Sequence, residues 1–116
     1  MLMEIDMSNV KNAPEGRYFV ESGWSDRHPW VVVKESPSGM TLTLVPVEVE
    51  RDPDFKPDFS VGGFSAHCNN QNEQTWIYAG TCPMRKRTIR LGKKGWAGGS
   101  FRETFKGPVR FYDYNF

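Results

Sequence analysis

The chain contains few cysteines and no long apolar run, and both absences narrow the class of protein. Its 116 residues include only two cysteines, too few for the disulfide framework of a small secreted domain. No apolar segment approaches the roughly 18–20 residues that a membrane-spanning helix needs. Glu4 and Asp6 stand where a secretory signal would be basic and then apolar. The sequence therefore predicts a protein of the cytoplasm with no membrane partner.

Long segments with the apolar periodicity of a helix are also missing. Eleven glycines and eight prolines interrupt the chain, and no segment of ten residues keeps the helical repeat of apolar positions. An aromatic content of 14% is too high for a disordered chain, and the length suffices for one core. We expect a mainly β fold, either a small SH3-like barrel or a compact antiparallel sandwich with long Gly/Pro loops. Residues 17–116 would form one β domain, and residues 1–16 a flexible lead-in or an edge strand.

Segments rich in aromatic and β-branched residues mark the expected strands. The turn residues Pro37 and Gly39 join two of them into a hairpin. A change of apolar parity at Val45-Pro46 predicts a bulge or bend. Trp24 and Trp30 are expected as core anchors. The expected strands are residues 17–22, 29–35, 40–51, 74–79, 88–91 and 108–112, and the expected loops are residues 51–63 and 93–100.

Charge is unevenly distributed, although the net charge is only +1. Residues 1–60 contain six Lys/Arg and eleven Asp/Glu, whereas residues 61–116 contain nine Lys/Arg and three Asp/Glu. If the fold keeps the second set together, it creates an electropositive surface that attracts anions. The alternative is that the two halves pair their charges with each other.

A basic run at residues 84–94 holds six cations and no acid. Trp96 and Arg102 follow it, and cations beside aromatic rings are the groups that a nucleotide or single-stranded nucleic acid requires. Glycines at residues 95–99 would let backbone N–H groups approach an oxyanion, although the glycine motifs of known phosphate loops are absent. The alternative is a solvated edge strand, because lysine and arginine protect exposed sheet edges from aggregation.

Two polar segments are further candidates for ligand recognition. Asp26 and Arg27 offer an acceptor and a fork-shaped donor to a small polar ligand, or they fix the turn in which they lie. Asn70 and Gln71 belong to the amide-rich residues 69–74, which could read the edge of a base or simply form a loop. Both interpretations stay open for each segment.

The sequence shows no metal-ligand spacing. His67 and Cys68 are adjacent, which is a poor chelating arrangement, and neither CxxC nor HxxxH occurs with Cys82 or His28. The acids at residues 48–54 lack calcium-loop spacing, and no third residue supports a Cys–His nucleophile. We therefore expect no cofactor, no metal site and no catalytic residue.

Two short motifs carry a resemblance to a known group of proteins. They are WSDR at residues 24–27, followed by a hairpin, and FYDYNF at residues 111–116, with GGF at 62–64 and CNNQ at 68–71 as weaker features. The chain resembles small tailed-bacteriophage accessory proteins of uncharacterised function over roughly residues 17–116. The resemblance implies a phage origin and a role in host takeover or counter-defence in the cytoplasm of an infected bacterium. It implies no catalytic residues.

These observations lead to a functional hypothesis of binding without catalysis. The leading expectation is an accessory protein that binds an anionic ligand, either a nucleotide signal or a nucleic acid. The alternative is a protein–protein inhibitor that docks on a host defence protein, and in either case the chain could form a homo-oligomer. The expected ligand-binding residues are Arg85, Lys86, Arg87, Arg90, Trp96, Arg102, Asn70, Gln71, Asp26 and Arg27.

Overall fold

A computed structural model describes residues 8–62 and 65–115, and it is built almost entirely of strands joined by turns and short 3-10 helices. The mainly β prediction is confirmed. The strands are β1 (Val10–Lys11), β2 (Tyr18–Ser22), β3 (Arg27–Glu35), β4 (Thr41–Arg51), β5 (Phe59–Gly62), β6 (Ser65–Cys68), β7 (Trp76–Thr81), β8 (Arg87–Gly92), β9 (Gly95–Trp96) and β10 (Phe101–Thr104). The 3-10 helices are η1 (Gln71–Glu73), η2 (Pro83–Arg85) and η3 (Ala97–Gly99).

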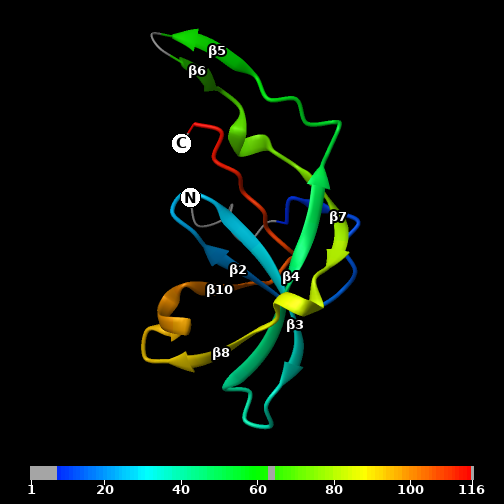
Figure 1. Cartoon of the computed structure of the whole chain (residues 1–116), viewed down its shortest axis with the longest axis vertical. Helices are drawn as coiled ribbons and strands as arrows, with labels where there is room; N and C mark the ends of the chain where they lie inside the picture. Colours follow the sequence, from blue (N-terminus) through cyan, green and yellow to red (C-terminus); the bar gives the residue numbers. More distant parts are fainter. Residues whose placement is uncertain (1–7, 63–64, 116) are drawn as a thin grey trace.

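Six of the strands form a closed antiparallel barrel. Their order is β4-β3-β2-β10-β9-β8, and the pairing of β8 with β4 closes the ring (Figure 1). The predicted hairpin of β3 and β4 is present, and Gly39 completes its turn with a φ of 75° that other residues rarely adopt. The predicted bulge at Val45-Pro46 is wrong, because the register shifts fall at Val32/Lys34 and Glu48/Val49 instead.

Pro46 marks the point at which β4 changes its neighbour. The strand pairs with β8 up to Leu44 and with β7 from Val47 onward. Proline lacks a backbone N–H, so it is best tolerated between two ladders, where neither partner needs that donor. The long strand β4 therefore belongs both to the barrel and to a small sheet in which β1 pairs in parallel with β7 (Figure 1).

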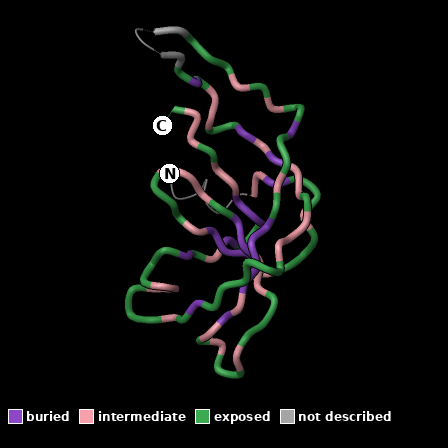
Figure 2. The backbone as a smooth tube through the Cα atoms, viewed as in Figure 1, coloured by how far each residue is buried: buried purple, intermediate pink, exposed green. Residues whose placement is uncertain are grey.

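The core fills the barrel where β2, β3 and β4 cross (Figure 2). Trp30 is 5% exposed and meets Phe101 edge to face at 5.5 Å, so its expected core position is confirmed. The same expectation for Trp24 is wrong, since this side chain is 91% exposed on the β2–β3 turn. The buried cluster consists of Phe19, Trp30, Leu42, Leu44, Ile89 and Phe101.

A hairpin of β5 and β6 projects from the barrel and makes the molecule elongated, with extents of 53 × 30 × 27 Å (Figure 1). Residues 51–63 therefore contain a strand that the sequence did not predict. The ring of Tyr114 lies 6.1 Å from Phe55 and 6.2 Å from Phe59, so the tail of the chain packs against this arm. Of the expected lead-in or edge strand at residues 1–16, residues 1–7 lie outside the described residues, and Val10–Lys11 form β1.

The C-terminal segment, residues 108–115, is held by side chains instead of a strand ladder. The predicted strand at 108–112 is reduced to one bridge between Arg27 and Phe111. Amide side chains satisfy its backbone: Gln74 accepts the Tyr112 N–H at 2.8 Å and donates to the Tyr112 carbonyl at 3.0 Å. Asn9 makes the same pair of bonds with Arg110, and Asn115 with Cys68. The Arg27–Phe111 bridge and the bond from the Asp113 N–H to Asp26 place residues 24–27 beside residues 111–115.

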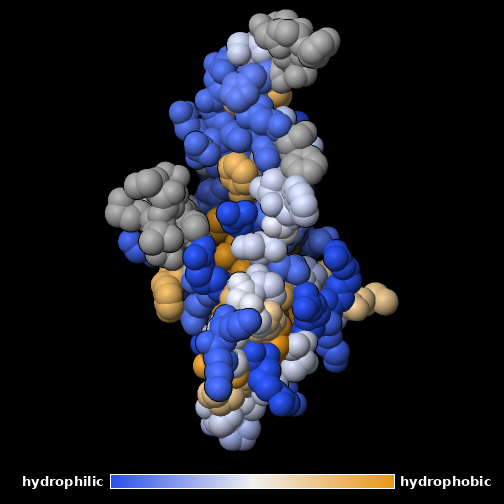
Figure 3. All heavy atoms as spheres, turned by 90° about the vertical axis from the view of Figure 1, so that its left-hand side faces the viewer, coloured by the Kyte–Doolittle hydropathy of each residue, from blue (hydrophilic) through white to orange (hydrophobic). Residues whose placement is uncertain are grey.

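The face of the molecule that Figure 3 shows is dominated by polar groups. On the face in Figure 3, hydrophobic residues form small separate patches among hydrophilic ones. Stable docking surfaces usually have a continuous apolar centre. This face of the described chain therefore offers no extended apolar surface.

Candidate functional site

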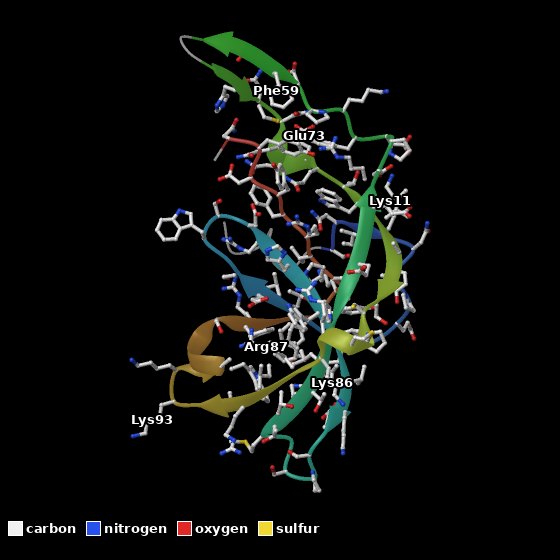
Figure 4. All side chains as sticks on the ribbon, viewed as in Figure 1. Lys11, Phe59, Glu73, Lys86, Arg87 and Lys93 are labelled. Atoms are coloured by element: carbon white, nitrogen blue, oxygen red, sulfur yellow. The ribbon has the colours of Figure 1, made fainter. Side chains whose placement is uncertain are left out.

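The structure does not bring the expected ligand-binding residues together. Arg85 ends η2, whereas Arg90 is exposed on β8 and Arg102 is exposed on β10. Figure 4 shows Lys86 and Lys93 near opposite ends of β8, with Lys93 pointing away from the barrel. The basic run thus spreads its cations along a hairpin and does not form one cluster.

Arg87 lies over one end of the barrel core. Its guanidinium is 4.9 Å from the centroid of the Phe101 ring, and its Nη1 donates to Glu21 Oε2 at 3.1 Å. The other oxygen of Glu21 accepts the Nε1–H of Trp30 at 3.0 Å. One carboxylate therefore connects Arg87 to the core, and at this point the acidic and basic halves of the chain do pair.

Replacing Arg87 with glutamine is expected to destabilise the fold by about 1–2 kcal/mol. The loss combines a partly exposed ion pair, worth about 0.5–1 kcal/mol, with a cation–π contact of similar size. Arg90→Gln removes the same charge from the same strand but no described ion pair, and it should change stability by less than about 0.5 kcal/mol. Urea unfolding of both variants measures the difference. Equal free energies of unfolding for the two variants would show that Arg87 does not stabilise the fold.

Trp96 belongs to the barrel core. Its ring meets Phe19 edge to face at 5.6 Å and 84°, and it packs against the buried cluster together with Ala97. The side chain is partly buried, so only part of the ring faces solvent. These contacts support a role in core packing rather than the expected stacking on a base.

The polar candidates hold backbone in place. Asn70 accepts the Asp58 N–H and donates to the Lys56 carbonyl, and Gln71 accepts the Tyr114 N–H. The Asn70 amide and the carbonyl oxygen of the Gln71 amide, both expected to read a base, are therefore engaged within the chain. Asp26 also binds backbone, because its side chain accepts the Asp113 N–H at 2.9 Å. The backbone of Arg27 exchanges two hydrogen bonds with that of Phe111.

A cleft that the sequence did not predict lies beside the end of the barrel. Its volume is about 510 Å³, within the range of small-molecule sites. Its lining combines the apolar residues Trp30, Pro46 and Val47 with charged side chains. We call it the Arg110 cleft; it is lined by Glu21, Gly23, His28, Pro29, Trp30, Pro46, Val47, Glu48, Val49, Arg85 and Arg110.

Arg110 is the most informative residue of this cleft. Its guanidinium lies between two aromatic rings, 5.2 Å from the centroid of Trp76 and 5.9 Å from that of Tyr112. Its Nη1 donates to the carbonyls of Arg27 and Phe111 at 3.0 and 2.6 Å. In residues 8–62 and 65–115, no carboxylate forms an ion pair with it and its Nε and Nη2 groups have no hydrogen-bond partner. The guanidinium is therefore only partly satisfied by the protein, and its remaining N–H groups can donate to an acceptor from outside the chain.

Positive potential in the cleft also acts on His28. Burial lowers the pKa of His28 below its usual 6.5, and the positive charges of Arg110 and Arg85 lower it further. Asp26 and Glu21 act in the opposite direction. Burial likewise lowers the pKa of Arg110, with Asp26 opposing this from a distance. The imidazole is therefore mostly neutral at pH 7, and a bound anion would favour its protonation.

The sequence signals for this cleft were weak. Arg85 came from the basic run, but Arg110 stands in an aromatic segment and His28 in the WSDR turn, 82 positions apart. The pairing of Arg27 with Phe111, and the bonds of Arg110 and Asp113 to residues 26–27, bring these two segments together. An arginine between two apolar residues, Val109-Arg110-Phe111, was the one available hint.

The acids on and after β4 do not gather into a metal site. Asp52 is buried and accepts hydrogen bonds from Lys11 at 2.6 Å and from Thr75 at 2.7 Å. These bonds, with one from the Asp54 backbone, lower the pKa of Asp52 from 3.8 to about 2. Cys68 and Cys82 are free thiols, and the described residues contain no group of three His, Cys, Asp or Glu suited to a metal.

The comparisons with known proteins add no assignment. No protein-family model, no curated protein and no solved structure matches this chain. Among the described residues, no helix has both the length and the apolar character needed to cross a membrane.

Proposed function

We propose that the protein binds a small organic anion of the nucleotide class in the Arg110 cleft, without catalysing its conversion. The unpaired, partly buried guanidinium of Arg110 carries this proposal. Two of its nitrogen groups are free to donate, and charge-assisted hydrogen bonds to phosphate are among the strongest that proteins form. Arg85 adds a second cation at the same cleft.

The apolar residues of the cleft suit the organic part of such a ligand. Trp30, Pro46 and Val47 lie beside the cations, so a ring can rest on apolar surface while its phosphate meets the arginines. Glu21 is already engaged by Arg87 and Trp30, which leaves Glu48 as the one other acid in the lining. With the resemblance to phage accessory proteins, this supports sequestration of a nucleotide signal as the biological use.

Calorimetric titration with 3′,5′-cyclic AMP at low salt tests the proposal. We expect saturable binding that weakens as salt rises, because screening reduces charge attraction. Arg85→Gln should weaken binding about tenfold, the loss of one charge-assisted contact. Lys93→Gln, a matched loss of one exposed charge at the far end of β8, should leave affinity unchanged. Arg85 is exposed and forms no described ion pair, so its variant should fold normally.

The same titration should depend on pH in a defined direction. The phosphodiester keeps one negative charge between pH 5 and pH 8, so any change reports on the protein. A bound anion favours protonated His28, and affinity should therefore increase as pH falls below about 6.5. His28→Gln should flatten this dependence. The assignment of the ligand to the Arg110 cleft would be contradicted if neither cyclic AMP nor AMP bound saturably. Equal weakening by Arg85→Gln and Lys93→Gln would also contradict it and would indicate a diffuse nucleic-acid surface.

A further inference from the structure

A second groove, of about 310 Å³, lies between the β2–β3 turn and the C-terminal segment. Trp24 lines it and is 91% exposed, although large aromatic side chains are mostly buried in a monomer. Tyr112 and Tyr114 provide a second aromatic surface, with ring centroids 4.9 Å apart and an interplanar angle of 83°. The carboxylates of Asp26 and Asp113 complete the lining.

Backbone hydrogen bonds fix the turn that carries Trp24. The Gly23 N–H donates to the Asp26 carbonyl at 2.9 Å, and Asp26 Oδ1 accepts the Asp113 N–H at 2.9 Å. Arg27 and Phe111 exchange two further bonds, at 2.8 and 3.0 Å. The exposed indole therefore stands on a backbone that is already ordered, which lowers the entropy cost of binding.

The two carboxylates leave acceptors free in the groove. Asp26 and Asp113 each use Oδ1 to accept a backbone N–H, whereas Oδ2 of each has no hydrogen-bond partner in the described chain. His28 is the one basic side chain in the lining, and partial desolvation, with the charges of Arg110 and Arg85, lowers its pKa below 6.5. Arg110 acts on Asp26 from a distance, while its Nη1 donates to two carbonyls. The groove is thus aromatic and acidic.

We propose that this groove binds the side chain of an arginine presented by a partner protein. A planar guanidinium stacks on an indole face while its edge donors reach carboxylate oxygens, and arginine is the cation that most often pairs with tryptophan. The complementarity lies in charge as well as shape, because free carboxylate oxygens stand beside the aromatic rings. This inference goes beyond the anion cleft and stands without it.

An NMR titration with acetyl-Gly-Arg-Gly-amide tests the proposal on the uniformly ¹⁵N-labelled protein at pH 7 and low salt. We expect saturable shifts of the Trp24 indole N–H and of the Asp113 and Tyr114 amides, with a dissociation constant of about 1–10 mM for this single side chain. The citrulline peptide, which has the same shape without the charge, should produce no saturable shift. Equal shifts with both peptides would overturn the proposal.

Three variants locate the site. Trp24→Ala and Asp113→Asn should each weaken the arginine peptide by about threefold to tenfold. Asparagine keeps the Oδ1 acceptor of Asp113, so that variant loses the charge and not the hydrogen bond. Phe105→Ala removes a different exposed aromatic, 77% exposed, and should have no effect. Unchanged affinity in both groove variants, with folded spectra, would overturn the assignment, as would shifts that map to β8 instead.

Discussion

Replacing Gln74 with methionine is expected to destabilise the fold by about 3–5 kcal/mol, although both side chains have similar volume. Gln74 is 2% exposed and its amide makes four hydrogen bonds. Methionine would leave the Trp76 Nε1–H and both backbone groups of Tyr112 without these partners. Each buried polar group that loses its partner costs about 1–3 kcal/mol. Urea unfolding measures the loss.

Gln71→Met provides the matched control for this substitution. Gln71 is only partly buried, and its side chain makes one described hydrogen bond, to the Tyr114 N–H. We expect a loss of about 1 kcal/mol. Similar losses in the two variants would mean that Gln74 does not hold the C-terminal segment as the contacts indicate. A normal barrel spectrum with altered signals only in residues 108–115 would locate the damage to that segment.

Trp96→Ala should reduce stability by about 3 kcal/mol and change nucleotide affinity little. Truncating a core aromatic costs about 3–5 kcal/mol, and the partial exposure of Trp96 places it at the lower end. The contact with Phe19, at 5.6 Å edge to face, is the main interaction lost. Unfolding curves and calorimetric titration with cyclic AMP on the same variant separate packing from ligand stacking.

Trp24→Ala is the control, since its indole is 91% exposed and its removal should change stability by less than about 0.5 kcal/mol. If Trp96→Ala melted like the natural protein but bound cyclic AMP about tenfold more weakly, the indole would stack on a base. The Arg110 cleft would then be the wrong location for the ligand.

The sequence predicted the barrel where periodicity and turn chemistry agreed. The strands β2, β3 and β4 carry β-branched and aromatic residues between clear turns, so their pairing follows from local signals. The sequence did not predict strands whose pairing depends on residues far away in the chain. β10 contains Arg102 and Glu103 and looks polar, but its partner β2 buries Phe19 and Val20 and supplies the missing apolar surface.

The candidate site could be predicted only in part, for a related reason. The basic run is visible in the sequence, so Arg85 was predicted as a site residue. Side chains alternate between the two faces of a strand, so the cations of β8 lie in different surroundings, which the run alone does not show. Trp24 and Trp30 look equivalent in sequence, and only the turn closed by Gly23 and Asp26 separates an exposed ring from a buried one. Burial of Arg110 without an ion pair depends on contacts that no local pattern encodes.

The manner in which the C-terminal segment is held has a consequence for synthesis on the ribosome. Asn9 bonds to Arg110, 101 positions later, and β2 closes the barrel only with β10. A growing chain therefore emerges with Phe19, Trp30 and Leu44 committed to a core whose last strand is still untranslated. At about 5–20 residues per second, this interval lasts several seconds. The barrel can therefore close only after β10 has been synthesised, and until then the apolar strands lack one of their partners.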